Sequence, residues 1–373
     1  MGDVCALHIY CYINSMLSHT GRCYARVGLL GNPSDGFEGK TLGFELKNFF
    51  AEVIIRPSDR VIIHPHPDLD PTSFGSMEDL HAFSEKYGYY GGLRLVQATV
   101  KKFFEYFLIS RRSGRSSVGE TGKAADAGFE VFYSTNIPRM VGLSGSSAIV
   151  LATFRALQSF FSLTLEELRI SGDEFACVIL NIERSELGIS GGLQDRVIQV
   201  YGGLVHMDFT SAATAGGFLP GAFTPLDQGL LPKLYLVYDE QRGGDSGKVH
   251  STVQDRWRSR EPSLVEGMVR LGTLADQGLD ALIGEDYVCL GRLMAMNFAI
   301  RRQLYSDAVV GERYIDLVEL LAGHGLTAKF TGSGGALVCI RTDGQNAWLD
   351  ADQEVALADM LSNKGHRLVQ IEV

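Results

Sequence analysis

The stretch PRMVGLSGSSAIV, from Pro138 to Val150, places a loop rich in glycine and serine directly before an apolar run. The apolar run continues to Phe154, and its spacing predicts a helix over residues 147–161. Backbone N–H groups at a helix N-terminus have no partners within the helix and carry partial positive charge, so a glycine-rich turn before such a helix can bind phosphate. A helix that is simply capped by serine has the same composition, and the stretch by itself leaves both interpretations open.

The atoms of this loop suit a phosphate and a hard cation. Glycine allows the backbone to approach a ligand closely, and serine hydroxyls supply hydrogen-bond donors or a lone pair for a cation such as Mg²⁺. We therefore predict a cofactor-binding loop made of Gly142, Leu143, Ser144, Gly145, Ser146, Ser147 and Ala148.

Composition and charge indicate a soluble protein that acts on a small molecule. The 373 residues are enough for two domains. Hydrophobic residues make up 45% of the chain, and no apolar run approaches the roughly 20 residues of a membrane span. The net charge of −10 argues against a nucleic-acid surface, although a local basic pocket can still bind an anionic substrate. We expect no nucleic-acid partner and no membrane partner.

The cysteines and the first residues favour a cytoplasmic location. Six cysteines are scattered without C-x-x-C spacing, which indicates neither a zinc site nor a disulfide framework and fits a reducing compartment. Residues 1–20 are mildly apolar but lack the basic region and the clear cleavage site of a secretory signal. We treat residues 1–20 as a leader of unknown role.

Hydrophobic periodicity predicts an α+β chain. In the first half we expect helices at 92–110, 147–161 and 165–186, and strands at 24–30, 41–46, 49–56, 60–64, 129–134 and 203–209. In the second half we expect several helices, with strands at 233–238, 327–331, 336–341 and 367–372. Residues 215–231, rich in glycine and proline, predict a linker between domains at 21–214 and 232–373. A basic loop rich in serine and glycine is expected at 111–123.

Two other glycine-rich segments fail the test for a P-loop. Gly119–Lys123 and Gly243–Lys248 both lack the first glycine of that motif, and neither lysine is followed by serine or threonine. Gly332–Gly335 leads into an apolar run of strand type, so it is not a dinucleotide-binding turn before a helix, and a tight hairpin is an alternative interpretation.

Four segments together resemble the GHMP small-molecule kinases. They are Ala25–Asp35, Gly142–Ala148, Gly191–Arg196 and Lys329–Gly335, which occur in the order and at the separations of that family. The resemblance covers nearly the whole chain beyond the leader and is greatest to members that phosphorylate the anomeric hydroxyl of D-glucuronate. It implies ATP and Mg²⁺ as cofactors, and a GHMP fold with an N-terminal ribosomal-S5-like domain and a C-terminal ferredoxin-like domain. Two alternatives remain: a family kinase for another sugar, such as arabinose or galactose, and a non-catalytic sugar or nucleotide sensor on the same fold.

The resemblance also implies catalytic and metal-binding residues. Asp195 would face the acceptor hydroxyl as the base, and Arg26 would stabilise charge on the transferred phosphoryl group. Ser147 and Glu183 would bind Mg²⁺, because one hydroxyl and one carboxylate are sufficient protein ligands for a cation that retains water. Glu186 lies one helical turn after Glu183 and is the competing metal ligand.

The sugar acid needs its own contacts. Asp35 matches a sugar-hydroxyl ligand of galactokinase-like proteins, and with Asp195 and the loop Gly332, Ser333, Gly334 and Gly335 it forms the predicted substrate site. For the carboxylate of the uronate we expect a guanidinium from Arg301 or Arg302, which point about 100° apart if the segment is helical, so that only one of them faces the cleft. The alternative is that both make salt bridges at the surface, because no periodicity fixes their direction. Arg139 and Lys248 are further candidates.

Overall fold

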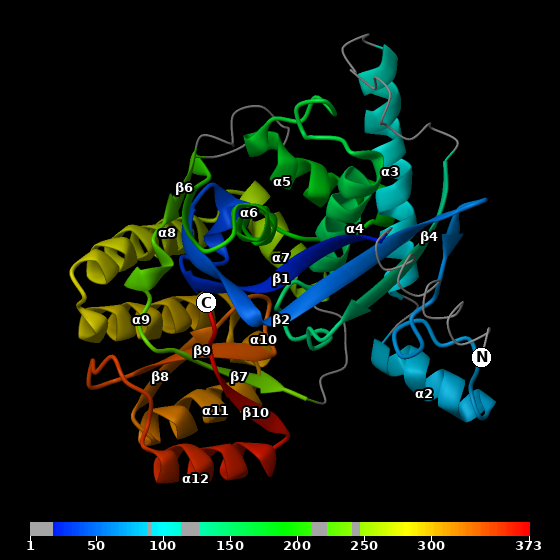
Figure 1. The fold of residues 1–373 in the computed structure, drawn as a ribbon. Coiled ribbons are helices and arrows are strands. Elements are labelled where there is room, and N and C mark those ends of the chain that lie inside the picture. The colour runs from blue at the N-terminus through cyan, green and yellow to red at the C-terminus, as the bar shows by residue number, and fades with distance from the viewer. Residues whose placement is uncertain (1–17, 88–90, 113–126, 211–221, 241–246) are drawn as a thin grey trace. The chain divides into compact units, whose positions relative to one another are not determined.

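The computed structural model describes residues 18–87, 91–112, 127–210, 222–240 and 247–373 (Figure 1). Three expectations fall wholly or partly outside these ranges: most of the leader 1–20, residues 113–123 of the basic loop, and residues 215–221 of the linker. No helix in the described ranges has the length and apolar character that crossing a bilayer would need.

The chain divides into two interleaved units. Unit 1 comprises Met1–Cys23, Phe50–Asn136 and Ser146–Gly191, and unit 2 comprises Tyr24–Phe49, Ile137–Gly145 and Gly192–Val373. The chain therefore passes between them several times, and the strands β1 (His19–Leu30) and β2 (Lys40–Ser58) each contribute to both. The division at residues 214 and 232 stays our proposal for the functional domains.

Unit 1 combines strands with helices around an aromatic core. The second part of β2 pairs antiparallel with β4 (Gly128–Thr135), which pairs parallel with β3 (Ile62–Ile63). The helical elements are α2 (Met77–Tyr87), α3 (Gly92–Arg112), α4 (Gly145–Phe161), α5 (Gly172–Asn181) and the π-helix η2 (Ile182–Glu186). The aromatic core contains four buried phenylalanines, Phe103 of α3 and Phe154, Phe160 and Phe161 of α4, whose rings contact one another. These contacts hold α4 against α3 through the apolar run seen in the sequence.

Unit 2 contains two sets of paired strands. In the first, β2 pairs antiparallel with β5 (Leu204–Asp208), and β5 pairs with β6 (Ala222–Leu226). In the second, the strand order is β10 (His366–Gln370), β7 (Tyr235–Asp239), β9 (Ala336–Arg341) and β8 (Leu326–Phe330), all antiparallel. The strand β6 lies within the segment 215–231 that the sequence predicts as a linker.

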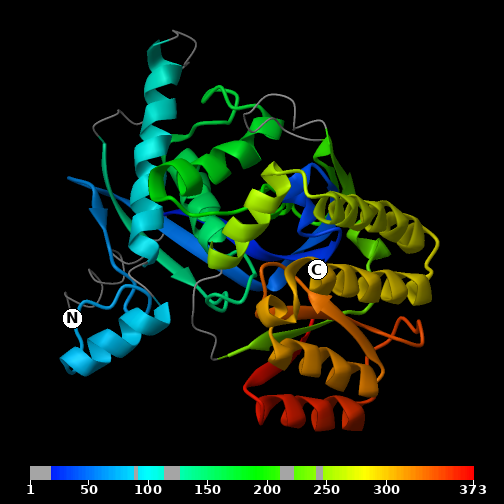
Figure 2. The ribbon, with the colours of Figure 1, turned by 180° about the vertical axis from the view of Figure 1, so that it is seen from behind.

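The helices of unit 2 support these strands. They are α6 (Gln194–Tyr201), α7 (Gly247–Arg258), α8 (Pro262–Ile283), α9 (Tyr287–Tyr305), α10 (Asp307–Val310), α11 (Glu312–Gly323) and α12 (Ala351–Ser362), with short 3-10 turns η1 (Ser34–Phe37) and η4 (Gln228–Leu230). Both views show α8 beside α9 and α11 beside α12 (Figures 1 and 2). The helices α9 and α11 contact β8, and α12 contacts β10.

The expected α+β class is confirmed, but several predicted elements are wrong in extent, among them two strands and a helix. The strands predicted at 41–46 and 49–56 are one continuous strand, β2. The polar residues in the middle of β2 form hydrogen bonds with a distant segment. The side chain of Asn48 bonds to the backbone of Gln370 and Glu372, and the Lys47 N–H donates to the Glu372 carbonyl at 2.9 Å. The helix predicted at 165–186 begins only at Gly172, because Ser171 and Glu174 form a capping box there.

Candidate functional site

The loop Gly142–Ala148 is held in a shape that depends on glycine. Gly142 has φ +72°, and a side chain there would bring its Cβ to 2.8 Å from the Gly334 carbonyl. Ser144 also has a left-handed φ, +64°. The helix α4 starts inside the loop at Gly145, as expected for N–H groups that are presented to a ligand. The chain passes from unit 2 to unit 1 between Gly145 and Ser146.

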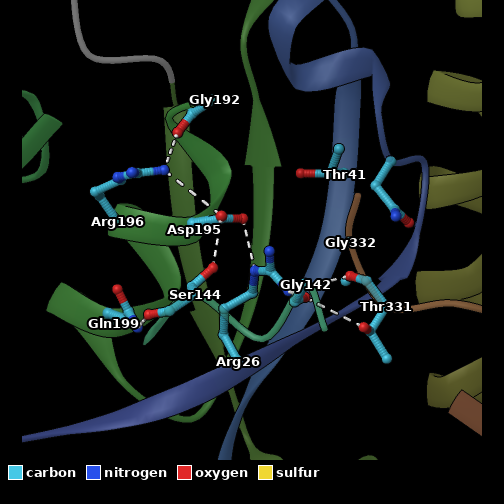
Figure 3. A network of polar contacts seen from close by, with 12 residues as sticks. Arg26, Thr41, Gly142, Ser144, Gly192, Asp195, Arg196, Gln199, Thr331 and Gly332 are labelled. Carbon is cyan, nitrogen blue, oxygen red and sulfur yellow. Dashed lines mark hydrogen bonds and ion pairs between the residues drawn. The ribbon is translucent and has the colours of Figure 1, made fainter. Parts of the chain in front are cut away.

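Asp195 lies at the centre of a polar network in unit 2 (Figure 3). It occupies the first turn of α6, and its two carboxylate oxygens have different donors. The Arg26 Nε donates to Oδ1 at 2.6 Å, and the Ser144 hydroxyl donates to Oδ2 at 2.6 Å. Arg196 adds a second cation at 3.5 Å from Oδ2. The predicted catalytic pair, Asp195 and Arg26, is therefore in direct contact, together with one serine of the cofactor loop.

Arg26 connects three of the segments that the sequence singles out. It extends from β1 and is 3% exposed, and its Nη1 donates to the carbonyls of Gly142 at 2.7 Å and Thr331 at 3.3 Å. A Cβ on Gly332 would lie 2.5 Å from the Gly142 carbonyl and 2.7 Å from the Arg26 guanidinium, so a larger residue here would force the backbone to shift. The guanidinium thus holds together the loop Gly142–Ala148, the carboxylate of Asp195 and the glycine-rich loop after β8.

The charge state of Asp195 follows from these neighbours. Burial alone opposes its ionisation, but the charge and hydrogen bond of Arg26, together with Arg196 and Ser144, hold the pKa of Asp195 well below its usual range. The carboxylate is therefore ionised at neutral pH and available to accept a hydrogen bond from a hydroxyl.

Asp35 is the second carboxyl group of this region. Its side chain lies against the Gly192 backbone so closely that a Cβ on Gly192 would come within 1.9 Å of a carboxyl oxygen. Burial, and then the neighbouring negative charge of Asp195, raise the pKa of Asp35 to about 7. Near neutral pH the two aspartates are therefore in different protonation states, one ionised and one partly protonated.

The predicted metal-binding residues lie in unit 1, at the start of α4 and in η2. Ser147 and Glu183 are both fully buried, and the Ser146 hydroxyl donates to the Glu183 Oε1 at 2.7 Å. The competing Glu186 is paired instead with Lys101 and, at 3.7 Å, with Lys102. The hydrogen bond from Lys101 lowers the pKa of Glu186, so its charge is already compensated within the protein.

The two adjacent arginines of α9 have different surroundings. Arg301 is 7% exposed, and its guanidinium donates to the carbonyls of Gly332 at 2.6 Å and Ser333 at 3.0 Å. Arg302 lies at the exposed surface and pairs with Asp307 at 2.7 Å. The structure thus brings Arg301, but not Arg302, to the loop Gly332–Gly335. Arg139 is half-buried, and the side chain of Lys248 lies outside the described part.

Two buried polar residues of this region were given no role by the sequence analysis. Gln199 is fully buried on α6, and its amide donates to the carbonyls of Tyr24 and Ser144, both at 3.1 Å. Lys329 is 1% exposed and makes three hydrogen bonds.

Comparisons with known sequences show which proteins this chain is similar to. The model of "GHMP kinases N terminal domain" matches residues 95–203. The chain is 42% identical over 324 residues to "Glucuronokinase 1" of Arabidopsis thaliana, covering 87% of this chain and 85% of the relative. It is 43% identical to "Probable glucuronokinase 2" of the same plant, covering 89% of this chain and 86% of the relative.

Solved structures with low sequence identity share the fold. A galactokinase from Lactococcus lactis, solved in complex with galactose, aligns with a TM-score of 0.68 at 15% identity and covers 98% of both chains. The mevalonate kinase of Methanococcus jannaschii aligns with a TM-score of 0.65 at 18% identity, covering 95% of this chain and 98% of that one. On the fold, the family match and the identity to its relatives, the chain belongs to the GHMP kinase family.

Proposed function

We propose that this protein is an ATP-dependent sugar kinase that converts D-glucuronate to D-glucuronate 1-phosphate. The observation that carries the proposal is the 42% identity, over 87% of this chain, to a protein named as a glucuronokinase. The contact between Arg26 and Asp195 supports it, because this pair offers an ionised carboxylate beside a fixed positive charge.

The reaction that we propose is a direct phosphoryl transfer. The oxygen of the anomeric hydroxyl attacks the γ-phosphorus of ATP, the bond from that phosphorus to the β,γ-bridging oxygen breaks, and ADP leaves. Asp195 accepts the hydroxyl proton as the new bond forms, when the hydroxyl has become more acidic, so a strongly basic carboxylate is unnecessary. Arg26 stabilises the negative charge on the phosphoryl group and keeps Asp195 ionised.

For Mg²⁺ we propose Ser147 and Glu183 as ligands. The Glu183 carboxylate is directed at the first turn of α4, where it accepts from Ser146, so hydroxyl and carboxylate oxygens meet there. These are the ligand types that Mg²⁺ prefers. When bound, the cation would neutralise charge on the phosphates of ATP.

The two glutamates of η2 give a matched test of the metal site. Glu183→Gln is expected to raise the Mg²⁺ concentration for half-maximal activity by about tenfold or more, by analogy with the loss of groups that support a metal site. Glu186→Gln should leave it nearly unchanged, because Glu186 is paired with Lys101 and Lys102. Titrating activity with Mg²⁺ at saturating ATP measures both. An equal response of the two variants, or a larger response of Glu186→Gln, would remove Glu183 as the ligand.

For the carboxylate of the sugar acid we propose Arg301 rather than Arg302. Arg301 lies beside the loop Gly332–Gly335, whereas the guanidinium of Arg302 is paired with Asp307 at the surface. The guanidinium fork has five donors, and a carboxylate is a suitable bidentate partner for it.

The proposed function is tested by measuring ADP release with purified protein. D-Glucuronate, D-galactose, L-arabinose and D-glucose are compared, and phosphorus NMR identifies the position that is phosphorylated. We expect the highest kcat/KM for D-glucuronate and a product phosphorylated at the anomeric oxygen. A higher kcat/KM for galactose or arabinose would assign the chain to another sugar, and ATP binding without turnover of any sugar would favour a sensor.

A further inference from the structure

Lys329 is a buried lysine at the end of β8, immediately before the glycine-rich loop. Its ammonium donates to the carbonyl of Gly28 at 2.8 Å, to Oδ1 of Asn32 at 2.6 Å and to the carbonyl of Phe330 at 2.8 Å. An ammonium has three N–H donors and no acceptor, so three acceptors at these distances use all of them. In the described residues Lys329 forms no ion pair with a carboxylate.

Placing an ammonium here has a cost. Burial, and then the positive charges of Arg301 and Arg26, hold the pKa of Lys329 well below its usual range. An apolar side chain such as methionine would fill the same space without that penalty. The three hydrogen bonds are what a lysine provides and a methionine does not.

These hydrogen bonds join two segments that are far apart in the sequence. One is the end of β1 together with the turn at Gly31 and Asn32, which leads to Asp35, and the other is the end of β8 with its following loop. The segments also touch through their backbones, since the Gly28 N–H donates to the Thr331 carbonyl at 2.9 Å. A Cβ on Gly28 would lie only 2.7 Å from that carbonyl.

Asn32 is the residue through which the turn is held. It is 2% exposed, its side chain bonds to Lys329 and to the Phe330 carbonyl, and its own carbonyl accepts from Asn297 of α9 at 3.1 Å. Asn297 also accepts from the Gly31 N–H at 2.8 Å. The side chain of Asn32 therefore faces inward and serves to fix the turn.

We propose that Lys329 is a positioning residue, whose ammonium holds the turn that carries Asp35 against the loop Thr331–Gly335 and thereby fixes the substrate side of the site. This inference rests on the proposed function, because it assigns Asp35 and the loop to the sugar. Displacing a substrate-binding group by about 1 Å can lower catalysis by about 10²-fold. The contacts of Lys329 act on both groups at once.

The test uses Lys329→Met, which keeps the volume but removes every donor. We expect kcat/KM for D-glucuronate to fall by about 10- to 10²-fold, with a much smaller change in the KM for ATP. Lys40→Met is the control, because the Lys40 ammonium bonds to Asp276 at 2.9 Å in the same unit. A hydrogen bond between Lys40 and the segment before Asp35 runs from the Ser34 hydroxyl to the Lys40 backbone carbonyl, which the substitution leaves in place. We expect normal kinetics for that control.

If Lys329→Met does not fold, Asn32→Ala is measured instead, since it removes one of the three acceptors and should show the same selective loss for the sugar. Folded Lys329→Met, or Asn32→Ala in its place, with wild-type kcat/KM and only a lower melting temperature would overturn the proposal. Wild-type activity on the sugar panel tests the proposed function separately. If another sugar is preferred, the same comparison is made with that sugar.

Discussion

Asp195→Asn is expected to lower kcat by about 10²- to 10⁴-fold while ATP binding is retained. The change removes the carboxylate that accepts the proton but keeps the shape of the side chain, and general-base catalysis contributes effects of about this size. The measurements are kcat with D-glucuronate by ADP release, and ATP affinity by calorimetry or fluorescence.

Asp208→Asn is the control for this experiment. Asp208 is an ionised aspartate of the same unit that lies 3.6 Å from Lys40, and we assign it no role in catalysis, so its replacement should leave kcat unchanged. Near-normal turnover of Asp195→Asn would dismiss Asp195 as the base. A measurable loss of kcat of up to about tenfold would indicate that positioning of the substrates dominates the phosphoryl transfer and would shift the main role to Arg26.

Arg26→Leu is expected to lower the free energy of unfolding by about 3–5 kcal/mol. That is the range for breaking a buried ion pair by removing one partner, and Arg196, 3.5 Å from Asp195, compensates only part of the charge that remains. Here Asp195 would lose its partner at 2.6 Å, and the carbonyls of Gly142 and Thr331 would lose a donor. Urea unfolding of the wild type and the variant at pH 7 measures the difference.

The pH dependence of this difference has a definite sign. The pKa of Asp195 is lower in the folded state than its ordinary value of 3.8. The ion pair therefore contributes its full share to the free energy of unfolding above pH 3.8, and this contribution is lost as the pH falls toward the folded-state pKa. The gap between wild type and Arg26→Leu should therefore narrow below about pH 4.

Arg302→Leu provides the control for stability. It removes an arginine whose ion pair with Asp307 is exposed to solvent, and exposed pairs contribute little. We expect a far smaller change than for Arg26→Leu. If the two variants unfold at the same urea concentration, burial of the Arg26–Asp195 pair has no special effect on stability.

Much of the fold could be predicted because local patterns were clear. The apolar run after the serine-rich loop predicted α4, alternating residues predicted β4, and a short continuous apolar run predicted β9. The start of α5 could also have been found, since Ser171 followed by Glu174 is a capping-box pattern. The continuity of β2 could not be predicted, because the hydrogen-bond partners of its polar residue Asn48 are backbone groups more than 300 positions away.

In the candidate site, too, residues within motifs could be predicted, and contacts between distant segments could not. Asp195 and Arg26 were predicted from their motifs, and they are in contact. Which of Arg301 and Arg302 is buried depends on the direction in which α9 presents them, and no nearby residue fixes that direction. The contacts of Lys329 join residues about 300 positions apart, and only the folded chain brings such residues together.

The bonds of Lys47 and Asn48 to Gln370 and Glu372 also matter for how the protein is made. Asn48 and Glu372 are 324 positions apart, and a ribosome that adds about 5–20 residues per second needs on the order of 16–65 s to synthesise that length. During this interval the backbone of the nascent strand around residues 47–48 lacks its final partner and remains open to pairing with other chains. Completion of unit 2 is therefore a late event in biosynthesis, because residues 370–372 are among the last to be synthesised.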